Sequence, residues 1–292
     1  MSHPSPLRPQ RTLRTAAVVI GRGYWSGCEN RVELRPAPVG SGIGFLRADL
    51  RPEAAVPAVV GAVVEARNRT QLVRGAASVH LVEHVMSALA GLGIDNCDVA
   101  VTAEELPGLD GSSRGFVEAI DAAGIVDQAA VSDALVVRKP VRVGDSASWI
   151  EAGPPRFPGL SIEYLLDYGP GPIGRQQLDI DVTPDSYRTH LAAARTFLSV
   201  DDAARLRAAG LGTTVSPGDL VLFGPDGPVG TTLRWQDECV RHKVLDCVGD
   251  LALAGRPLHA HVRAFRSGHA LNAELVRELL ACDAGLRLGR TA

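Results

Sequence analysis

The sequence predicts an α+β protein built from two similar halves, each with a sheet layered on helices. In each half, segments that alternate apolar and polar residues come first and helical segments follow, which favours separate layers over alternating βαβ units. Each half also carries one long amphipathic helix with a histidine in its second turn. With 292 residues, 46% of them hydrophobic, the chain can bury a sizeable core.

We expect residues 1–10 to be a polar tail and residues 11–126 to form the first α+β domain. A long helix is predicted over 78–93, capped by Ser78 and ended by a glycine pair. A linker is expected over 126–134. The strands and the short helix predicted for this half lie at 11–19, 31–35, 98–102 and 116–123.

The second α+β domain is expected over residues 135–292. Its most prominent helix is predicted over 237–251, with Asp237 as its cap. A tight turn is expected at 267–269. The other predicted strands are 135–143, 149–152, 160–167, 220–223 and 259–265, and the other predicted helices are 187–194, 199–209 and 273–281.

Composition narrows the class of protein. A formal charge of -3 gives no basic field for nucleic acid. Five cysteines, none in a C-x-x-C pair, do not form a disulfide framework and suit a reducing compartment. The first ten residues lack an apolar signal segment, and the longest apolar run is too short to span a membrane. We therefore expect a cytoplasmic monomer without a transmembrane segment, with peripheral contact to a membrane left open.

The first candidate site is on the helix predicted over 237–251. His242 and Asp246 are four residues apart, so their side chains lie on one helix face and could supply two ligands to a metal ion. An ordinary His–Asp pair on a helix surface has the same spacing. The pattern alone leaves both interpretations open.

The second candidate site is the segment His80-Leu81-Val82-Glu83-His84. It matches H-x-x-E-H, the inverted zinc-protease motif, in which both histidines bind zinc and the glutamate is the base. A protease of this kind is therefore one alternative. It would leave His242 and Asp246 without a role.

A simpler hypothesis joins the two helices into one zinc site. His84, His242 and Asp246 would be the protein ligands, and the fourth position would be left for water, whose pKa zinc lowers to about 7. Glu83 could take a proton from that water. Among the other polar residues, Lys243 and Thr196 could stabilise an oxyanion and His269 could protonate a leaving group.

Several longer motifs, read in order, resemble one family. The sequence is similar to the UDP-3-O-acyl-N-acetylglucosamine deacetylases, the zinc enzymes of lipid A synthesis, from about residue 10 to residue 281. The motifs that carry the resemblance are Val82-Glu83-His84, residues 88–96, Leu109-Asp110-Gly111-Ser112, Ala194-Arg195-Thr196-Phe197, residues 241–250 and Ser267-Gly268-His269-Ala270-Leu271-Asn272.

The resemblance implies an active site between the two halves and a catalytic role for most of these side chains. Zn²⁺ would be held by His84, His242 and Asp246. Glu83 would be the general base, and His269 the general acid or an electrostatic partner. The remaining implied roles are oxyanion contacts from Thr196 and Lys243, and orientation of His269 by Asp250.

The resemblance also implies how the substrate, UDP-3-O-acyl-GlcNAc, is held. Phe197 would contact the sugar, and Asp167-Tyr168 would lie near the substrate. Residues 199–223 correspond to an insert that forms an apolar passage for the acyl chain. Separately, Arg138 and Lys139 could meet the diphosphate, although any exposed Arg-Lys pair would have the same appearance in the sequence.

Three positions depart from the pattern of the family. Trp25 stands where an early turn usually has histidine, Gly212-Thr213-Thr214 replaces a Gly-Gly-Ser segment, and His80 replaces serine or threonine. These changes bear on how the sugar nucleotide is held and on the acyl length that is accepted. They motivate an alternative function, a catalytically weak paralogue that binds a sugar nucleotide or an acyl lipid.

Overall fold

Two sheets with the same strand order form the framework of the protein. The computed structural model describes residues 8–50, 52–216 and 218–288. In the sheet of the first half, β4 and β9 run parallel and the other neighbours run antiparallel. The order of its strands is β2 (Ala17–Arg22), β3 (Glu29–Pro36), β9 (Cys97–Val101), β4 (Ile43–Arg47) and β5 (Ala54–Pro57).

The sheet of the second half repeats this order. Its β14 and β19 run parallel, as β4 and β9 do in the first half. The order is β12 (Val141–Gly144), β13 (Trp149–Gly153), β19 (Leu258–Phe265), β14 (Leu160–Asp167) and β15 (Arg175–Val182), with the short β11 (Leu135–Val136) also pairing with β19. The predicted α+β class with two similar halves is therefore confirmed.

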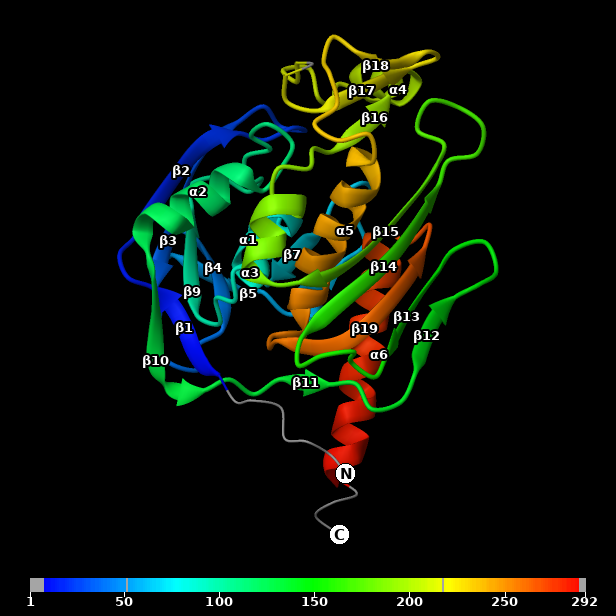
Figure 1. Ribbon diagram of the computed structural model, residues 1–292. Coiled ribbons are helices and arrows are strands. Elements are labelled where there is room, and N and C mark those ends of the chain that lie inside the picture. Colours follow the sequence, from blue (N-terminus) through cyan, green and yellow to red (C-terminus); the bar gives the residue numbers. More distant parts are fainter. Residues whose placement is uncertain (1–7, 51, 217, 289–292) are drawn as a thin grey trace.

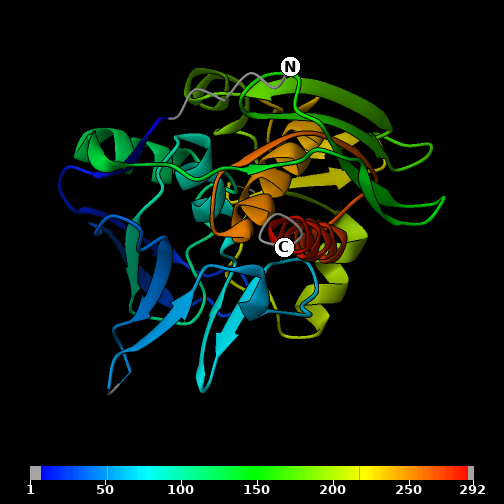
Figure 2. The ribbon, with the colours of Figure 1, turned by 90° about the horizontal axis from the view of Figure 1, so that it is seen from below.

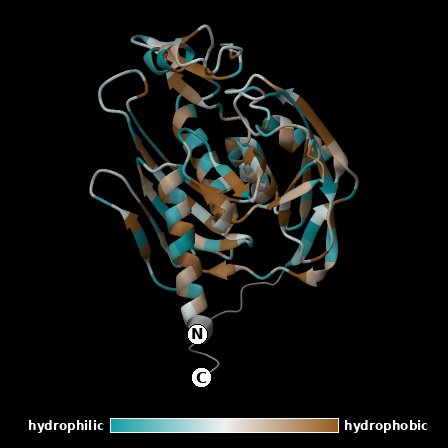
Figure 3. Cartoon of the chain, turned by 180° about the vertical axis from the view of Figure 1, so that it is seen from behind, coloured by the Kyte–Doolittle hydropathy of each residue, from teal (hydrophilic) through white to brown (hydrophobic). Residues whose placement is uncertain are grey.

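Alternating burial explains why these segments form strands. In β3, Asn30, Val32 and Leu34 are buried, while the residues between them are exposed or only partly buried. A period of two is what a sheet with one face on the core requires. Figure 3 colours each residue by its hydropathy, and both hydrophobic and hydrophilic residues occur along the strands and the C-terminal helix.

Each half carries one insert. It follows β5 in the first half and β15 in the second, and it precedes the long helix of that half. The first insert follows a short 3₁₀ turn, η1 (Val60–Ala62), and the second follows a short helical segment. The first insert is the small sheet β6 (Val63–Val64), β7 (Gln71–Arg74) and β8 (Ala77–His80), and the second contains β16 (Phe197–Ser199), α4 (Val200–Ala208), β17 (Val221–Gly224) and β18 (Gly227–Val229).

Helices fill the space between the two sheets (Figure 1). The two central ones are α1 (Glu83–Gly91) and α5 (Glu238–Leu251), which pack against each other. Seen from below, α6 (His269–Leu288) lies beside α5 (Figure 2). The remaining helical segments are α2 (Arg114–Ala123), α3 (Pro184–Ser186), η2 (Tyr187–Leu191) and η3 (Ala252–Ala254).

The contact between α1 and α5 requires a glycine at position 249. A Cβ atom placed there would lie 2.1 Å from the carbonyl oxygen of Glu83 and 3.1 Å from the amide nitrogen of Ser87. The two helix backbones therefore touch directly at this point. One turn away, the hydroxyl of Ser87 donates a 2.7 Å hydrogen bond to the carbonyl oxygen of Leu245 and accepts one from the hydroxyl of Tyr187.

Some element boundaries differ from the prediction. The helix expected from Ser78 begins only at Glu83, because residues 77–80 pair with β7 as strand β8 and Leu81 turns the chain with a φ of 60°. Ser78 therefore caps no helix. His269, predicted in a turn, begins α6.

The predicted ends of the first domain also need correction. Most of the expected linker at 126–134 belongs to strand β10 (Ile125–Val131), which pairs antiparallel with β1 (Pro9–Leu13). Pro9 and Gln10, predicted in the tail, are part of that strand. Residues 1–7 of the predicted tail lie outside the described residues.

No helix in the described ranges combines the length and the apolar character needed to cross a membrane.

Replacing Gly249 by alanine should destabilise the protein and separate α1 from α5. The added methyl group would have to displace backbone, and such overpacking costs about 1–3 kcal/mol or more. We expect a lower midpoint of thermal unfolding together with a loss of activity. Gly285→Ala in α6, where a Cβ would meet nothing within 4 Å, is the matched control and should be neutral or stabilising. Equal melting temperatures for the two variants would contradict the direct backbone contact.

Candidate active site

Three buried side chains from α1 and α5 converge between the two halves. Nε2 of His242 lies 3.3 Å from Oδ1 of Asp246, and Nε2 of His84 lies 3.9 Å from the same oxygen. One candidate ligand atom from each residue lies within 4.8 Å of the other two. Ligands about 2.0–2.2 Å from one tetrahedral zinc ion are about 3.3–3.6 Å apart, so small movements would bring the three onto one ion.

The ionisation of this cluster suits a divalent cation. Burial lowers the pKa of His84 to about 3 and also lowers the pKa of His242, so both imidazoles are neutral near pH 7. Burial alone would raise the pKa of Asp246, but the ammonium group of Lys243, which donates to Oδ2 of Asp246, holds it well below its usual value. Two neutral imidazoles and one carboxylate are a donor set that binds zinc.

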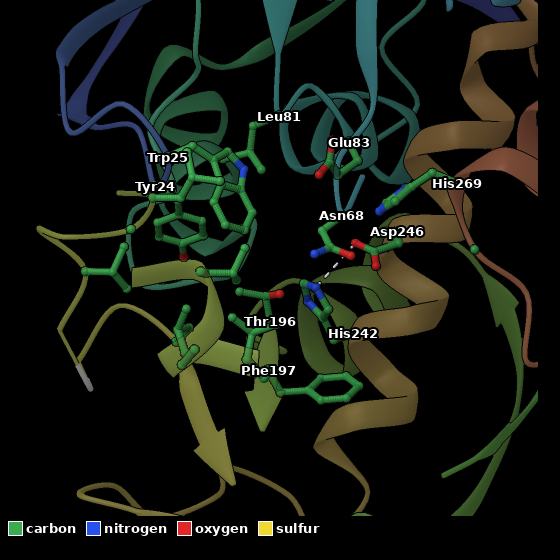
Figure 4. A pocket seen from close by; sticks show the side chains of 18 of the residues that line it. Tyr24, Trp25, Asn68, Leu81, Glu83, Thr196, Phe197, His242, Asp246 and His269 are labelled. Atoms are coloured by element: carbon green, nitrogen blue, oxygen red, sulfur yellow. Dashed lines mark ion pairs between the residues drawn. The ribbon is translucent and has the colours of Figure 1, made fainter. Parts of the chain in front are cut away.

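Neighbouring groups hold these side chains in position. Nδ1 of His242 lies 3.0 Å from the carbonyl oxygen of Ala194, so Nδ1–H donates there and Nε2 keeps its lone pair towards Asp246. Lys243 donates from Nζ to Oδ2 of Asp246 at 2.7 Å, which leaves Oδ1 facing the histidines. In Figure 4, His242 and Asp246 lie next to each other on the wall of the cavity.

Glu83 is placed to exchange a proton near neutral pH. It is the first residue of α1 and is only 2% exposed. Burial raises the pKa of its carboxyl group to about 7. Its Oε2 accepts a 3.0 Å hydrogen bond from the backbone N–H of Thr70. A carboxyl group with a pKa close to the working pH is suited to general base catalysis.

His269, in contrast to Glu83, is held in its protonated form near pH 7. Its Nδ1 lies 2.8 Å from Oδ2 of Asp250. Burial alone would lower the pKa of His269, but the Asp250 carboxylate raises it to about 9. His269 is therefore protonated near pH 7, while Glu83 is close to half ionised. A carboxyl group with a pKa near the working pH beside an imidazole with a higher pKa can serve as a base and an acid at the same pH.

The second insert brings Thr196 and Phe197 to the same cavity. Thr196 is held from both sides, since its N–H donates to the carbonyl oxygen of Gly111 at 2.7 Å and its carbonyl accepts from Val221 at 2.9 Å. The preceding residue, Arg195, forms a buried ion pair with Glu238 at the start of α5, with Nε 2.7 Å from Oε1. This pair ties the insert to the helix that carries His242.

A cavity of about 470 Å³ joins this polar cluster to an apolar region under the second insert. Tyr168 and Phe197 lie on its wall with their ring centroids 5.6 Å apart. Trp25 and Tyr24 lie on the other side of the cavity from His269 (Figure 4). The apolar region is lined by Leu198, Ala203, Leu206, Leu211, Val215, Leu220 and Leu222.

Comparison with known proteins identifies the family. The model of the family described as LpxC, UDP-3-O-acyl N-acetylglycosamine deacetylase, matches residues 10–281. The chain belongs to this family. A UDP-3-O-acyl-N-acetylglucosamine deacetylase from Myxococcus xanthus (strain DK1622) is 38% identical over 278 residues, which cover 93% of this chain and 86% of the relative. The resemblance drawn from the motifs is thereby confirmed.

The structure of this family member brings most of the predicted site residues to one cavity. The residues that line it include Glu83, His84, Tyr168, Thr196, Phe197, His242, Lys243, Asp246 and His269. Asp250 lies behind His269 as its partner. Their individual roles stay predictions.

Two predicted substrate contacts lie elsewhere. Asp167 is not among the residues that line the cavity, and its carboxylate accepts a hydrogen bond from the N–H of Gly169. Lys139 is exposed on the segment between β11 and β12, also outside that lining. The roles of Lys139 and Asp167 as substrate contacts stay predictions.

The inverted-protease alternative does not fit the structure. His80 belongs to strand β8 and not to the helix of His84, and its Nε2 lies 3.3 Å from Oε1 of Glu104. His80 is not part of the candidate metal cluster. A motif that requires two histidines on one helix face is therefore absent here.

Sequence reasoning missed Thr70 and Asn68, both in the first insert. Thr70 contacts Glu83, Asp250 and His269, and Asn68 lines the cavity with a φ of 57°. Neither lies in a motif used for the prediction. The only signal was their position just before a strand of the first insert.

Removing one imidazole should remove the metal ion. We expect purified protein to hold about one zinc ion per chain, and His242→Ala to hold almost none, because two ligands bind zinc far more weakly than three. His80→Ala is the matched control and should keep its zinc. Elemental analysis of both variants provides the measurement, and zinc loss from the His80 variant alone would support the protease geometry instead.

Proposed function

We propose that this chain hydrolyses the acetamide of UDP-3-O-acyl-N-acetylglucosamine and releases acetate, an early committed step of lipid A biosynthesis. The observation that carries the proposal is the meeting of the α1 and α5 motifs of this family at one buried cluster of two histidines and an aspartate. We further propose that the protein acts as a cytoplasmic monomer, without nucleic-acid partners.

We assign His84, His242 and Asp246 as the residues that hold a Zn²⁺ ion. When bound, this ion supplies Lewis acidity and lowers the pKa of water to about 7. Lys243 keeps Asp246 ionised and fixes the direction of its free oxygen. The buried surroundings strengthen every charge interaction at this point.

The remaining side chains divide the proton transfers between them. Glu83, ionised above a pKa of about 7, accepts the proton of the attacking water. Lys243 and Thr196 stabilise the negative charge that develops on the carbonyl oxygen. His269, held protonated by Asp250, gives its proton to the departing amine. The reaction yields acetate and the free amino sugar.

We propose that this substrate occupies the cavity with its sugar near the polar cluster and its acyl chain in the apolar region. We assign Phe197, beside His242 with ring centroids 6.3 Å apart, to contact with the sugar ring. The apolar region under the second insert would take the acyl chain, whose burial contributes about 0.8 kcal/mol for each CH₂ group. We assign Tyr168, which lines the cavity and is 57% exposed, to contact with the nucleotide part.

Acetate release from the UDP-sugar tests the proposal directly. Purified protein should release acetate and free amine in equal amounts, a chelator should stop the reaction, and added zinc should restore it. Glu83→Gln should lower kcat by about 10²–10⁴-fold, because it removes general base catalysis. Tight binding of the UDP-sugar with no acetate release would favour the alternative of a catalytically weak, ligand-binding paralogue.

The pH dependence of kcat/KM should be bell-shaped. Activity needs ionised Glu83, so it rises as pH increases through the pKa of this group, about 7 without a cation and lower beside one. Activity also needs protonated His269, so it falls as pH rises through about 9. Asp250→Asn removes the charge that raises the pKa of His269 and should move the basic limb to lower pH. An unmoved basic limb in this variant would contradict the assignment.

A further inference from the structure

Thr70 connects the proposed base to the proposed acid. It precedes β7 and is 3% exposed. Its backbone N–H donates to Oε2 of Glu83 at 3.0 Å, and its hydroxyl donates to Oδ1 of Asp250 at 2.6 Å. The same hydroxyl oxygen lies 3.2 Å from Nδ1 of His269. One residue of the first insert thus contacts Glu83, Asp250 and His269.

We propose that the Thr70 hydroxyl is a positioning group that fixes the Asp250–His269 pair relative to Glu83 during catalysis. This inference rests on the proposed function. The Thr70 hydroxyl itself touches no reacting atom in this scheme. It acts through the orientation of the Asp250 carboxylate and hence of the His269 ring.

The contacts of Asp250 show why this hydroxyl matters. Its Oδ2 accepts from Nδ1 of His269 and from Nδ2 of Asn272, each at 2.8 Å, whereas Thr70 donates to Oδ1. Asp250 is only 1% exposed. Loss of the hydroxyl would leave a buried carboxylate oxygen without this donor, and rotation of the carboxylate towards another donor would carry His269 with it.

The backbone of Thr70 is fixed independently of its hydroxyl. Gln71, the next residue, pairs with His80 in the β7–β8 ladder. The carbonyl oxygen of Thr70 accepts from the N–H of Val82, immediately before α1, and its own N–H donates to Glu83. A change of side chain alone therefore leaves the contact with Glu83 in place, which separates the role of the hydroxyl from that of the backbone.

Four variants test whether the Thr70 hydroxyl positions the Asp250–His269 pair or whether the Thr70 side chain only fills space. Thr70→Val keeps the volume and removes only the hydroxyl, whereas Thr70→Ser and Thr70→Ala form a second pair that differs only in the hydroxyl. We expect kcat of Thr70→Val to fall by about tenfold or more, since hydrogen bonds to buried charged groups are strong. KM and zinc content should stay within about twofold of wild type, because the metal cluster and the substrate contacts are untouched. Thr12→Val is the matched control.

The control carries the same change at a site far from the cavity. Thr12 is also buried, with its hydroxyl donating to the carbonyl oxygen of Asn96 at 2.8 Å and accepting from the N–H of Ala37 at 3.0 Å. We expect Thr12→Val to lower the melting temperature without lowering kcat. If Thr70→Val fails to fold, the Thr70→Ser and Thr70→Ala pair decides, with the serine variant at least about fivefold faster.

A double-mutant cycle with Asp250→Asn tests whether the Thr70 hydroxyl influences kcat through the Asp250 carboxylate. Thr70→Val should cost less than about threefold in the Asp250→Asn background, because the partner of the hydroxyl has already lost its charge. Wild-type kcat in Thr70→Val, equal rates for the serine and alanine variants, or full additivity with Asp250→Asn would each overturn the proposal while leaving the deacetylase function intact. Absence of acetate release by the wild type would overturn both.

Discussion

The direct contact of α1 with α5 is the constraint on which the candidate site depends. At Gly249 the backbone of α5 meets the carbonyl oxygen of Glu83 so closely that a Cβ would lie 2.1 Å from it. Glu83 and His84 sit at that crossing on one side, and His242 and Asp246 on the other. Any separation of the helices would move the two histidines apart, and the cluster would no longer fit one ion.

Burial and neighbouring charges then give each ionisable group a different state in a small volume. Burial keeps both histidines of the cluster neutral and brings Glu83 to a pKa of about 7. The Asp250 carboxylate overcomes the same burial at His269 and keeps it protonated. One enclosed site can therefore offer neutral ligands, a base and an acid at the same pH.

The repeated topology explains how one chain builds such a site from distant segments. Both five-strand paths have the same order with parallel strands at the same place, and each half places an insert before its long helix. The first insert supplies Asn68 to the wall of the cavity and the second supplies Thr196, so the two inserts reach the cavity from opposite halves. The framework thus fixes the helices, and the inserts shape the substrate cavity.

The sequence by itself determined the α+β class, the family and the long helix of His242, because apolar periodicity and extended motifs are local properties of the chain. It placed the start of α1 wrongly at Ser78, since strand β8 and the left-handed turn at Leu81 depend on pairing with β7. Only the tertiary structure showed that Thr70 contacts Asp250, 180 residues away, and that Lys139 lies outside the cavity lining. Contacts between segments so far apart leave no periodic signal in a single sequence, because the packing of the two halves creates them.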